Sequence, residues 1–148
     1  MLRHLDYPPI WLLAALGLVW AETLLAPQVV PMAWAQKFGT GLVVVAIALF
    51  AAAAWEFWRA RSTIIPHQTP QRLITGGIFA LSRNPIYLAD VVLLAGLSLR
   101  WGAVSGVLLA PVLVFVLQRR FIAGEEARIR ASFGQAAEQY FHRTRRWL

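Results

Sequence analysis

The sequence contains no cysteine among its 148 residues. This absence excludes disulfide bonds, thiolate metal sites and a cysteine nucleophile, although it leaves the cellular compartment open. Charged residues are scarce as well, since Asp, Glu, Lys and Arg make up 14% of the chain. We expect no metal site. Hydrophobic residues make up 59%, with seven Trp, which is outside the usual range of soluble domains. The composition therefore indicates an integral membrane protein with a single domain.

Four apolar stretches divide the chain, at residues 9–26, 38–58, 85–99 and 102–118. At a rise of about 1.5 Å per residue the first two reach roughly 27 and 31 Å, which matches a hydrocarbon core of about 30 Å. The third and fourth reach only about 22 and 25 Å by the same rise, and Arg100 and Trp101 separate them. We therefore expect an all-α membrane bundle of about four transmembrane helices, with a short hairpin of the last two, a loop at 59–84 and a tail at 119–148.

The net charge of +7 is distributed unevenly along the chain. The connections at 27–37 and 100–101 carry only Lys37 and Arg100, whereas arginines cluster in the loop and the tail. The clustered residues are Arg59, Arg61, Arg72, Arg83, Arg119, Arg120, Arg128, Arg130, Arg143, Arg145 and Arg146. The positive-inside rule then predicts that both termini and the loop are cytoplasmic, as in a bacterial inner-membrane protein. Because topology accounts for the charge, we expect the lipid bilayer rather than nucleic acid as the partner.

The loop at 59–84 is interrupted repeatedly by proline and glycine, so it is predicted to be structured but not helical. The adjacent Gly76 and Gly77 permit close approach of the backbone to a partner or ligand. A simple turn is the alternative, and an isolated Gly-Gly pair favours it. The pair is not a dinucleotide-binding fingerprint, because no strand is expected before it.

The tail is predicted to form one amphipathic helix from about residue 119 to 140. On a wheel of about 100° per residue, four side chains share one apolar face: Ile122, Ile129, Phe133 and Tyr140. Glu125 and Glu126 border that face, which is the one expected to contact the bundle. The alternative is a pair of solvated glutamates on an interfacial helix, and spacing alone favours it.

Polar side chains also mark the start of the third stretch. Tyr87 precedes Asp90 by three residues and Arg83 precedes it by seven, so the three can share one helix face near the cytoplasmic end. A charge at the membrane centre costs about 3 kcal/mol on insertion scales, so a carboxylate here points to a function. Glu22 and Glu56 lie near the ends of their stretches, and an interfacial location explains both.

Two segments resemble motifs of one enzyme family. The segment TGGIFALSRNPIYL, residues 75–88, is similar to the pattern T-x-G-P-[YF]-x-x-x-R-[HN]-P-x-Y of isoprenylcysteine carboxyl methyltransferases and the related phospholipid methyltransferases. The tail resembles the C-terminal motif of the same enzymes through Glu125-Glu126, Ile129, Phe133-Gly134, Tyr140 and Arg146-Trp147-Leu148. The resemblance covers about the last 80 residues, and hydropathy alone matches the first two stretches.

The resemblance implies a methyltransferase that uses S-adenosylmethionine and releases S-adenosylhomocysteine. Its cofactor site would form where the loop and the tail meet the membrane helices. By position, the cofactor-binding residues are Gly76, Gly77, Arg83, Asn84, Pro85, Tyr87, Glu125 and Glu126. The chain departs from the family pattern at Ile78, Asn84, Ala89, Asp90 and Ala137, and these departures concern the acceptor more than the cofactor.

The same resemblance implies methyl transfer to a lipophilic or membrane-associated acceptor. We expect Arg83, Tyr87 and Asp90 at the catalytic site, and Asp90 is assigned from its place on the Tyr87 face, where a carboxylate can orient a polar acceptor or take up its proton. The acceptor stays open among a prenylated cysteine, a phospholipid amine, a thiol and other lipophiles, and the oligomeric state stays open too. Three other functions stay open: a small proton-coupled transporter that uses Glu22, a non-catalytic membrane assembly subunit, and a nicotinamide-dependent reductase of related fold.

Single cysteine substitutions test the topology, because the chain has no cysteine of its own. Ser62→Cys and Ser132→Cys are expected to react with an impermeant thiol reagent only from the cytoplasmic side, and Gln28→Cys from the outside. The measurement is labelling of right-side-out and inverted membrane vesicles. Reaction of Ser62→Cys from the outside would contradict a cytoplasmic loop.

Overall fold

The computed structural model describes residues 7–25, 33–61, 72–103 and 105–148. These residues form helices and no strand, which confirms the all-α prediction, whereas Gln28 and Ser62 lie outside them. The α-helices are α1 (Pro8–Leu25), α2 (Ala33–Ala60), α3 (Pro85–Trp101), α4 (Ser105–Leu117), α5 (Ala123–Phe133) and α6 (Gln135–Arg143). A 3-10 helix, η2 (Gly77–Ala80), and a π-helix, η3 (Gln118–Ile122), complete the described elements.

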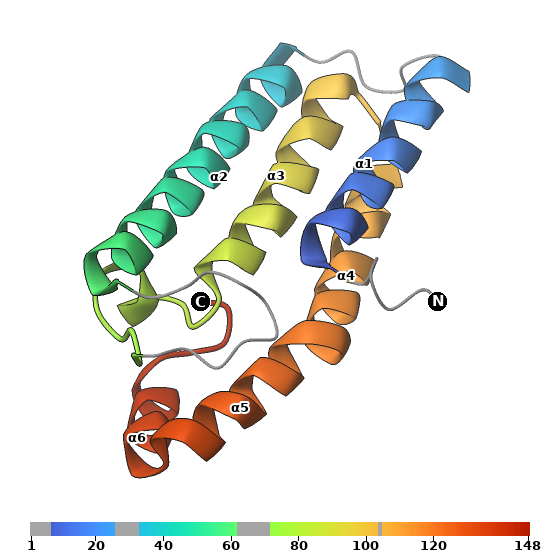
Figure 1. Ribbon diagram of the computed structural model, residues 1–148. Coiled ribbons are helices and arrows are strands. Elements are labelled where there is room, and N and C mark those ends of the chain that lie inside the picture. The colour runs from blue at the N-terminus through green and yellow to red at the C-terminus, as the bar shows by residue number, and fades with distance from the viewer. Residues whose placement is uncertain (1–6, 26–32, 62–71, 104) are drawn as a thin grey trace.

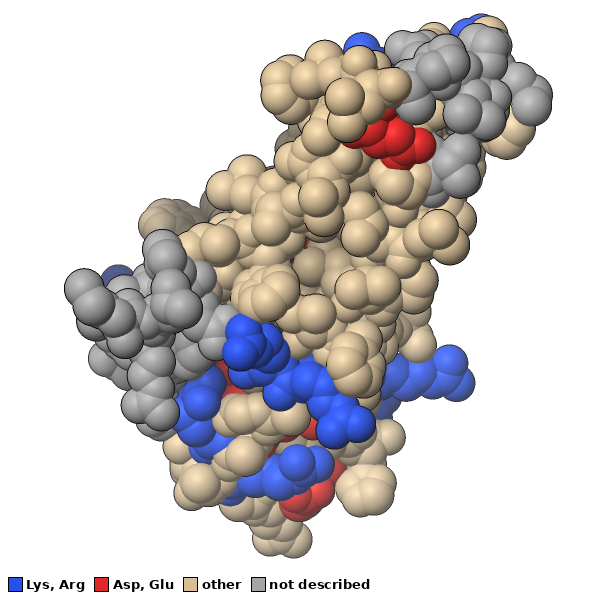
Figure 2. Space-filling model, turned by 90° about the vertical axis from the view of Figure 1, so that its right-hand side faces the viewer, with Lys and Arg blue, Asp and Glu red and all other residues tan. Residues whose placement is uncertain are grey.

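Among the described residues, three helices are long and apolar enough to cross a membrane: α1, α2 and the continuous helix of residues 105–133. Large apolar side chains on them are exposed, among them Leu18, Val44 and Phe115. Figure 2 shows the resulting uncharged surface along the shaft of the molecule, with most of the visible Lys and Arg at one end. Because such a large apolar surface is stable in lipid rather than in water, the chain is a membrane protein.

The expected count of four transmembrane helices stays a prediction, because α3 has only 17 residues. That length is at the lower limit for a helix that crosses the hydrocarbon core. Figure 1 shows α3 between α2 on one side and α1 with α4 on the other, and α3 contacts all three. The short helix is therefore the central helix of the bundle.

Glycines allow α2 and α3 to pack closely. A Cβ atom at Gly39 would lie 2.5 Å from the carbonyl oxygen of Gly96 and 2.8 Å from the amide nitrogen of Arg100. A Cβ atom at Gly96 would in turn lie 2.9 Å from the carbonyl oxygen of Gly39. At the same end Arg100 Nη1 donates a hydrogen bond to Thr40 Oγ1 at 2.6 Å. Close contacts of this kind hold helices together in lipid, where apolar burial alone gives little preference.

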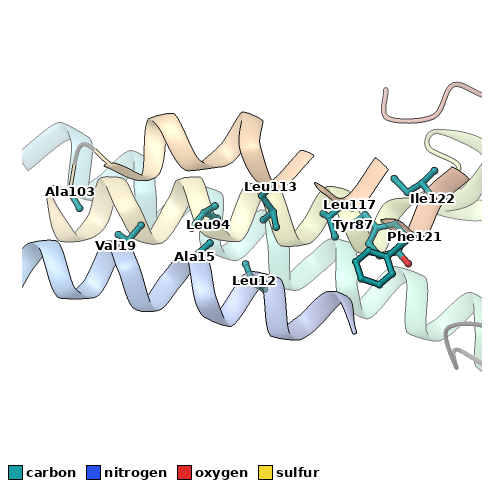
Figure 3. Close-up of a cluster of buried hydrophobic side chains, with 10 residues drawn as sticks. All are labelled: Leu12, Ala15, Val19, Tyr87, Leu94, Ala103, Leu113, Leu117, Phe121 and Ile122. Carbon is teal, nitrogen blue, oxygen red and sulfur yellow. The ribbon is translucent and has the colours of Figure 1, made fainter. Parts of the chain in front are cut away.

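The other side of α3 contributes to an apolar core. Leu94 of α3 packs in one cluster with Val19 of α1 and Leu113 of α4, and Figure 3 shows these side chains between the three helices. Leu94 and Val19 are fully buried. The cluster continues along α4 into η3, so the core extends from the hairpin end to the end where the loop and the tail lie.

The connection between α3 and α4 is the tight hairpin that the sequence predicts. Gly102 ends α3 with a φ of 72°, a left-handed conformation that glycine adopts without strain. The Ser98 side chain fills the space beside Gly106, so the two helices pack closely. The Ser105 amide donates to Glu22 Oε2 at 3.0 Å at the start of α4. Glu22 thus satisfies a helix N-terminus, which supports the structural explanation of this acid.

The fourth stretch was expected to end at residue 118, and α4 ends beside it at Leu117, but the helix itself does not stop there. η3 continues α4 as a π-helix, and α5 extends the helix to Phe133. The apolar run ends at Arg119 and Arg120, but charged side chains end hydrophobicity without ending backbone hydrogen bonding. A π-turn contains an additional residue, so η3 changes the angular register of α5 relative to α4.

The single tail helix expected from residue 119 to 140 is wrong. Gly134, with φ 49° and ψ −121°, separates α5 from α6. This conformation lies outside the helical region and is accessible mainly to glycine. Figure 1 shows α6 folded back beside the end of α5, with the C-terminal residues returning to the start of α3. Tyr140 therefore does not extend the apolar face of α5.

Gly39→Ala tests the close packing of α2 on α3. The added methyl group meets backbone atoms of α3, so we expect a loss of about 1–3 kcal/mol in the free energy of unfolding. Gly41→Ala is the control on the same helix, because no atom lies within 4 Å of the position that its Cβ would take. Thermal unfolding in detergent, followed by Trp fluorescence, measures both; equal midpoints would contradict the close contact.

Candidate functional site

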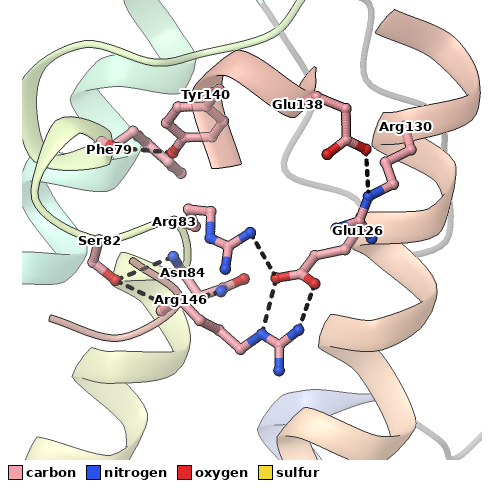
Figure 4. Close-up of polar contacts among 9 residues, drawn as sticks. All are labelled: Phe79, Ser82, Arg83, Asn84, Glu126, Arg130, Glu138, Tyr140 and Arg146. Carbon is pink, nitrogen blue, oxygen red and sulfur yellow. Dashed lines mark hydrogen bonds and ion pairs between the residues drawn. The ribbon is translucent and has the colours of Figure 1, made fainter. Parts of the chain in front are cut away.

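The loop and the tail meet at Glu126. Its Oε1 lies 3.3 Å from Arg83 Nη1 of the loop. Arg146 near the C-terminus donates twice to the same carboxylate, from Nε to Oε1 at 2.9 Å and from Nη2 to Oε2 at 2.6 Å. Figure 4 shows both guanidinium groups directed at this carboxylate. The structure therefore brings together Arg83 and Glu126, which come from the two segments that carry the family resemblance.

This ion cluster is buried and has an excess of positive charge. The exposed fraction of the side chain is 14% for Arg83 and 5% for Glu126. Burial lowers the pKa of Arg83 from its usual value, and the nearby Glu126 carboxylate opposes that shift. Hydrogen bonds to Glu126 raise the pKa of Arg146. Since an arginine stays protonated in proteins, one carboxylate faces two cations.

Arg83 retains one donor without an acceptor. Its Nε is enclosed and makes no hydrogen bond. The guanidinium carbon lies 4.5 Å from the centre of the Phe141 ring of α6, so the ring supports the guanidinium group from one face. A buried N–H without an acceptor carries a desolvation cost, and natural proteins retain few of them. Because 14% of the Arg83 side chain stays exposed, the guanidinium group of this positively charged cluster is a candidate contact for an anionic ligand group, although Nε itself is enclosed.

Backbone hydrogen bonds hold the loop against the tail. The Arg83 amide donates to the Arg145 carbonyl oxygen at 3.0 Å, and Asn84 Nδ2 donates to the Arg146 carbonyl oxygen at 2.9 Å. The Tyr140 hydroxyl of α6 donates to a carbonyl of η2 at 2.7 Å. Burial raises the pKa of Tyr140, so this hydroxyl stays a donor. The loop conformation next to α3 thus depends on the last residues of the chain.

The start of α3 is shaped by the same contacts. Pro85 is the first residue of α3, where a missing N–H has no cost, and it is buried. Asn84 precedes it but makes no capping hydrogen bond with its side chain, because that side chain donates a hydrogen bond to the Arg146 carbonyl oxygen. Asn84 and Pro85 therefore position the start of α3 and do not leave polar groups for a ligand.

Tyr87 and Glu125 form a second link between the two motifs. The Tyr87 hydroxyl donates to Glu125 Oε1 at 2.7 Å. The Tyr87 ring stacks on Phe121 of η3, with the ring centroids 6.4 Å apart. Glu126 is buried and Glu125 is hydrogen-bonded, so the alternative of two solvated glutamates is wrong. The adjacent glutamates instead reach two different residues of the loop and α3.

Asp90 lies one turn after Tyr87 and is buried, with 5% of its surface exposed. Arg83 lies before the start of α3 and pairs with Glu126. The expectation that Arg83, Tyr87 and Asp90 share one helix face is therefore wrong for Arg83. Pairing of Asp90 with Arg83, the structural alternative for this acid, does not occur.

Gly77 makes the close approach that the glycine pair permits, but to a side chain of the protein itself. Its φ is 56°, and a Cβ atom there would collide with the carboxylate of Glu56 on α2. Glu56 is buried and lies 3.2 Å from Arg59 Nη2. Gly76 differs, because it is exposed and no atom lies within 4 Å of the position that its Cβ would take.

Glu56 and Arg146 are the site residues to which the sequence assigned no role. In the sequence, Glu56 is an acidic residue within an apolar stretch, and a location at the membrane interface is enough to explain it. Arg146 belongs to the segment Arg146-Trp147-Leu148 that resembles the C-terminal family motif, but nothing in the sequence gave it a partner. Its bidentate contact with Glu126 becomes apparent only in three dimensions.

A family model described as phospholipid methyltransferase matches residues 34–136. No curated protein and no solved structure matches the chain. The matched segment contains Arg83, Tyr87, Glu125 and Glu126, and it ends within the tail, before Arg146. Because the match spans more than half of the 148 residues, the chain belongs to the phospholipid methyltransferase family.

Proposed function

We propose that the chain is an S-adenosylmethionine-dependent methyltransferase that acts on a lipophilic or membrane-associated acceptor. The family is one of methyltransferases, and residues of both motifs that the resemblance assigns to the cofactor lie at one end of the bundle. The observation that carries the proposal is the buried Arg83–Glu126 pair with its unmatched guanidinium donor.

The residues of this cluster fit the polar groups of the cofactor. S-adenosylmethionine has an α-carboxylate, which suits the partly exposed Arg83 guanidinium group and the excess positive charge around it. Its α-ammonium and ribose hydroxyls are donors, which suit the Glu125 carboxylate. Glu126 is already bonded to two arginines, so its contribution is to hold Arg83 in place. Arg83 and Glu125 are therefore the principal contacts in this proposal.

When bound, the cofactor supplies an electrophilic methyl group on a sulfonium. The protein has to position an acceptor and exclude water, which contributes several kcal/mol in such displacements without an acid–base team. The cluster lies at the arginine-rich end of the helices, where a soluble cofactor meets the membrane boundary. By the positive-inside rule that end is cytoplasmic, as in a bacterial inner-membrane protein.

The alternatives have less support. The Glu22 carboxylate accepts a hydrogen bond from the start of α4, which gives it a structural task in place of proton transport. Family membership favours a methyltransferase over a nicotinamide-dependent reductase or a non-catalytic assembly subunit.

Arg83→Lys tests the guanidinium contact directly. The substitution keeps the positive charge but removes Nε and the planar fork, so we expect S-adenosylhomocysteine to bind about 1–3 kcal/mol more weakly. Arg130→Lys is a matched control, because Arg130 also stacks on Phe141, at 4.7 Å, and pairs with a glutamate, yet its side chain is 47% exposed. Calorimetry of the purified proteins measures both affinities. Equal affinity of the Arg83→Lys and wild-type proteins would argue against this contact.

Glutamine substitutions test the two carboxylates. Glu125→Gln and Glu126→Gln are each expected to weaken S-adenosylhomocysteine binding by about 1–3 kcal/mol. Glu126→Gln also leaves the largely enclosed Arg83 and the partly exposed Arg146 without a full counter-charge, so its unfolding midpoint is expected to fall. Glu138→Gln, at an exposed glutamate, is the control. If both site variants bind as the wild type does, these carboxylates have no part in cofactor binding.

A further inference from the structure

Asp90 is a buried carboxylate to which the described residues offer no hydrogen-bond donor and no cation. It is 95% buried, and the described part of the chain offers it no hydrogen bond and no ion pair. The enclosed polar atoms that lack a partner are Arg83 Nε and Ser105 Oγ among the described residues. The Asp90 oxygens are not among them, so they retain a small accessible surface.

The environment of Asp90 differs from that of the other acids in the bundle. Glu22 bonds a helix N-terminus, Glu125 bonds a tyrosine, and Glu56 and Glu126 have arginine partners. Each of these four acids thus has a hydrogen-bond donor or an arginine as its partner. Asp90 lacks one although it lies in α3, about 8 Å along the helix from the arginine-rich end.

The side chain of Asp90 is on the core side of α3. On a helical wheel it lies about 60° from Tyr87 and about 40° from Leu94, both of which belong to the buried cluster. It lies about 120° from Gly96, which faces α2. Asp90 is therefore next to Tyr87, whose hydroxyl bonds Glu125 of the proposed cofactor site.

We infer that Asp90 is the specificity-determining residue for the acceptor: it binds the ammonium or other hydrogen-bond-donating head group of an amphiphile and excludes a carboxylate head group. The inference rests on the proposed function, because it assigns the acceptor side of the same site. A carboxylate without a partner attracts a cationic donor, which supplies both the missing hydrogen bond and the missing charge. An anionic head group would meet like charge in a poorly solvated position.

The inference separates two of the acceptors that the resemblance leaves open, a prenylated cysteine and a lipophilic amine. A prenylated cysteine presents a carboxylate to be methylated, and Asp90 disfavours it. An amine on an apolar chain suits both Asp90 and the exposed apolar surfaces of α1, α2 and α4. It binds Asp90 as the ammonium and gives one proton to the carboxylate, which frees the nitrogen lone pair to accept a methyl group. Because Asp90 is one of the positions at which the chain departs from the family pattern, the preference belongs to this chain and its aspartate.

Binding of simple amphiphiles tests the inference without turnover. The full-length protein in an uncharged detergent is titrated at neutral pH with decylamine, decanol, decanoate and ethylamine, and separately with S-adenosylhomocysteine. Decylamine is expected to bind at least about tenfold more tightly than decanol or decanoate, since hydrogen bonds to charged groups contribute on that scale. In Asp90→Asn the advantage of decylamine over decanol is expected to disappear, with S-adenosylhomocysteine affinity unchanged. Glu138→Gln is the control and keeps the wild-type pattern.

Each outcome of these titrations supports or overturns the role inferred for Asp90. Equal binding of decylamine to the wild type and Asp90→Asn, or equal binding of decanoate and decylamine to the wild type, overturns the inference. Ethylamine binding as tightly as decylamine identifies a soluble amine as the ligand and overturns the amphiphile assignment. Joint loss of the unfolding midpoint and of S-adenosylhomocysteine affinity in Asp90→Asn shows a structural role and overturns it too. If the wild type selects decylamine but does not bind S-adenosylhomocysteine, the proposed function fails while the Asp90 site stands.

Discussion

The shared carboxylate of Glu126 is the contact on which the site depends. It is bonded to Arg83 in the loop and to Arg146 near the C-terminus, so three segments far apart in the sequence meet at one side chain. Ion pairs in a buried position are favourable only when desolvation of both partners is compensated by good geometry. Here the bidentate contact of Arg146 supplies that geometry, and backbone bonds from Arg83 and Asn84 to the tail reinforce it.

A membrane environment explains why α3 is the element that carries the site residues. In lipid, helices gain little from apolar burial against one another, so close backbone contact decides their arrangement. Gly39 and Gly96 provide it between α2 and α3. Because of this contact, one side of α3 packs against α2. Tyr87 and Asp90 lie on the other side, toward α1, α4 and η3.

The helix that begins with α4 shows how a local irregularity serves the site. A regular α-helix through residues 118–122 would give α5 a different rotation about its axis. With the π-helix in place, Phe121 stacks on Tyr87, and Glu125 and Glu126 reach Tyr87 and Arg83. Gly134 then reverses the chain, so that α6 and the tail return to the loop.

The sequence by itself determined the all-α class, the membrane location and the family, because hydropathy and local motifs carry that information. It also placed two stretches, at 9–26 and 85–99, within two residues of the ends of α1 and α3. It did not predict the π-helix or the break at Gly134, since the charges that end an apolar run say nothing about backbone hydrogen bonds. Only the tertiary structure decided that Arg83 pairs with Glu126 and not with Asp90, and that Arg146 joins them. The physical reason is that side-chain pairing depends on distances between segments about 40 to 60 residues apart in the sequence, which periodicity within one helix does not specify.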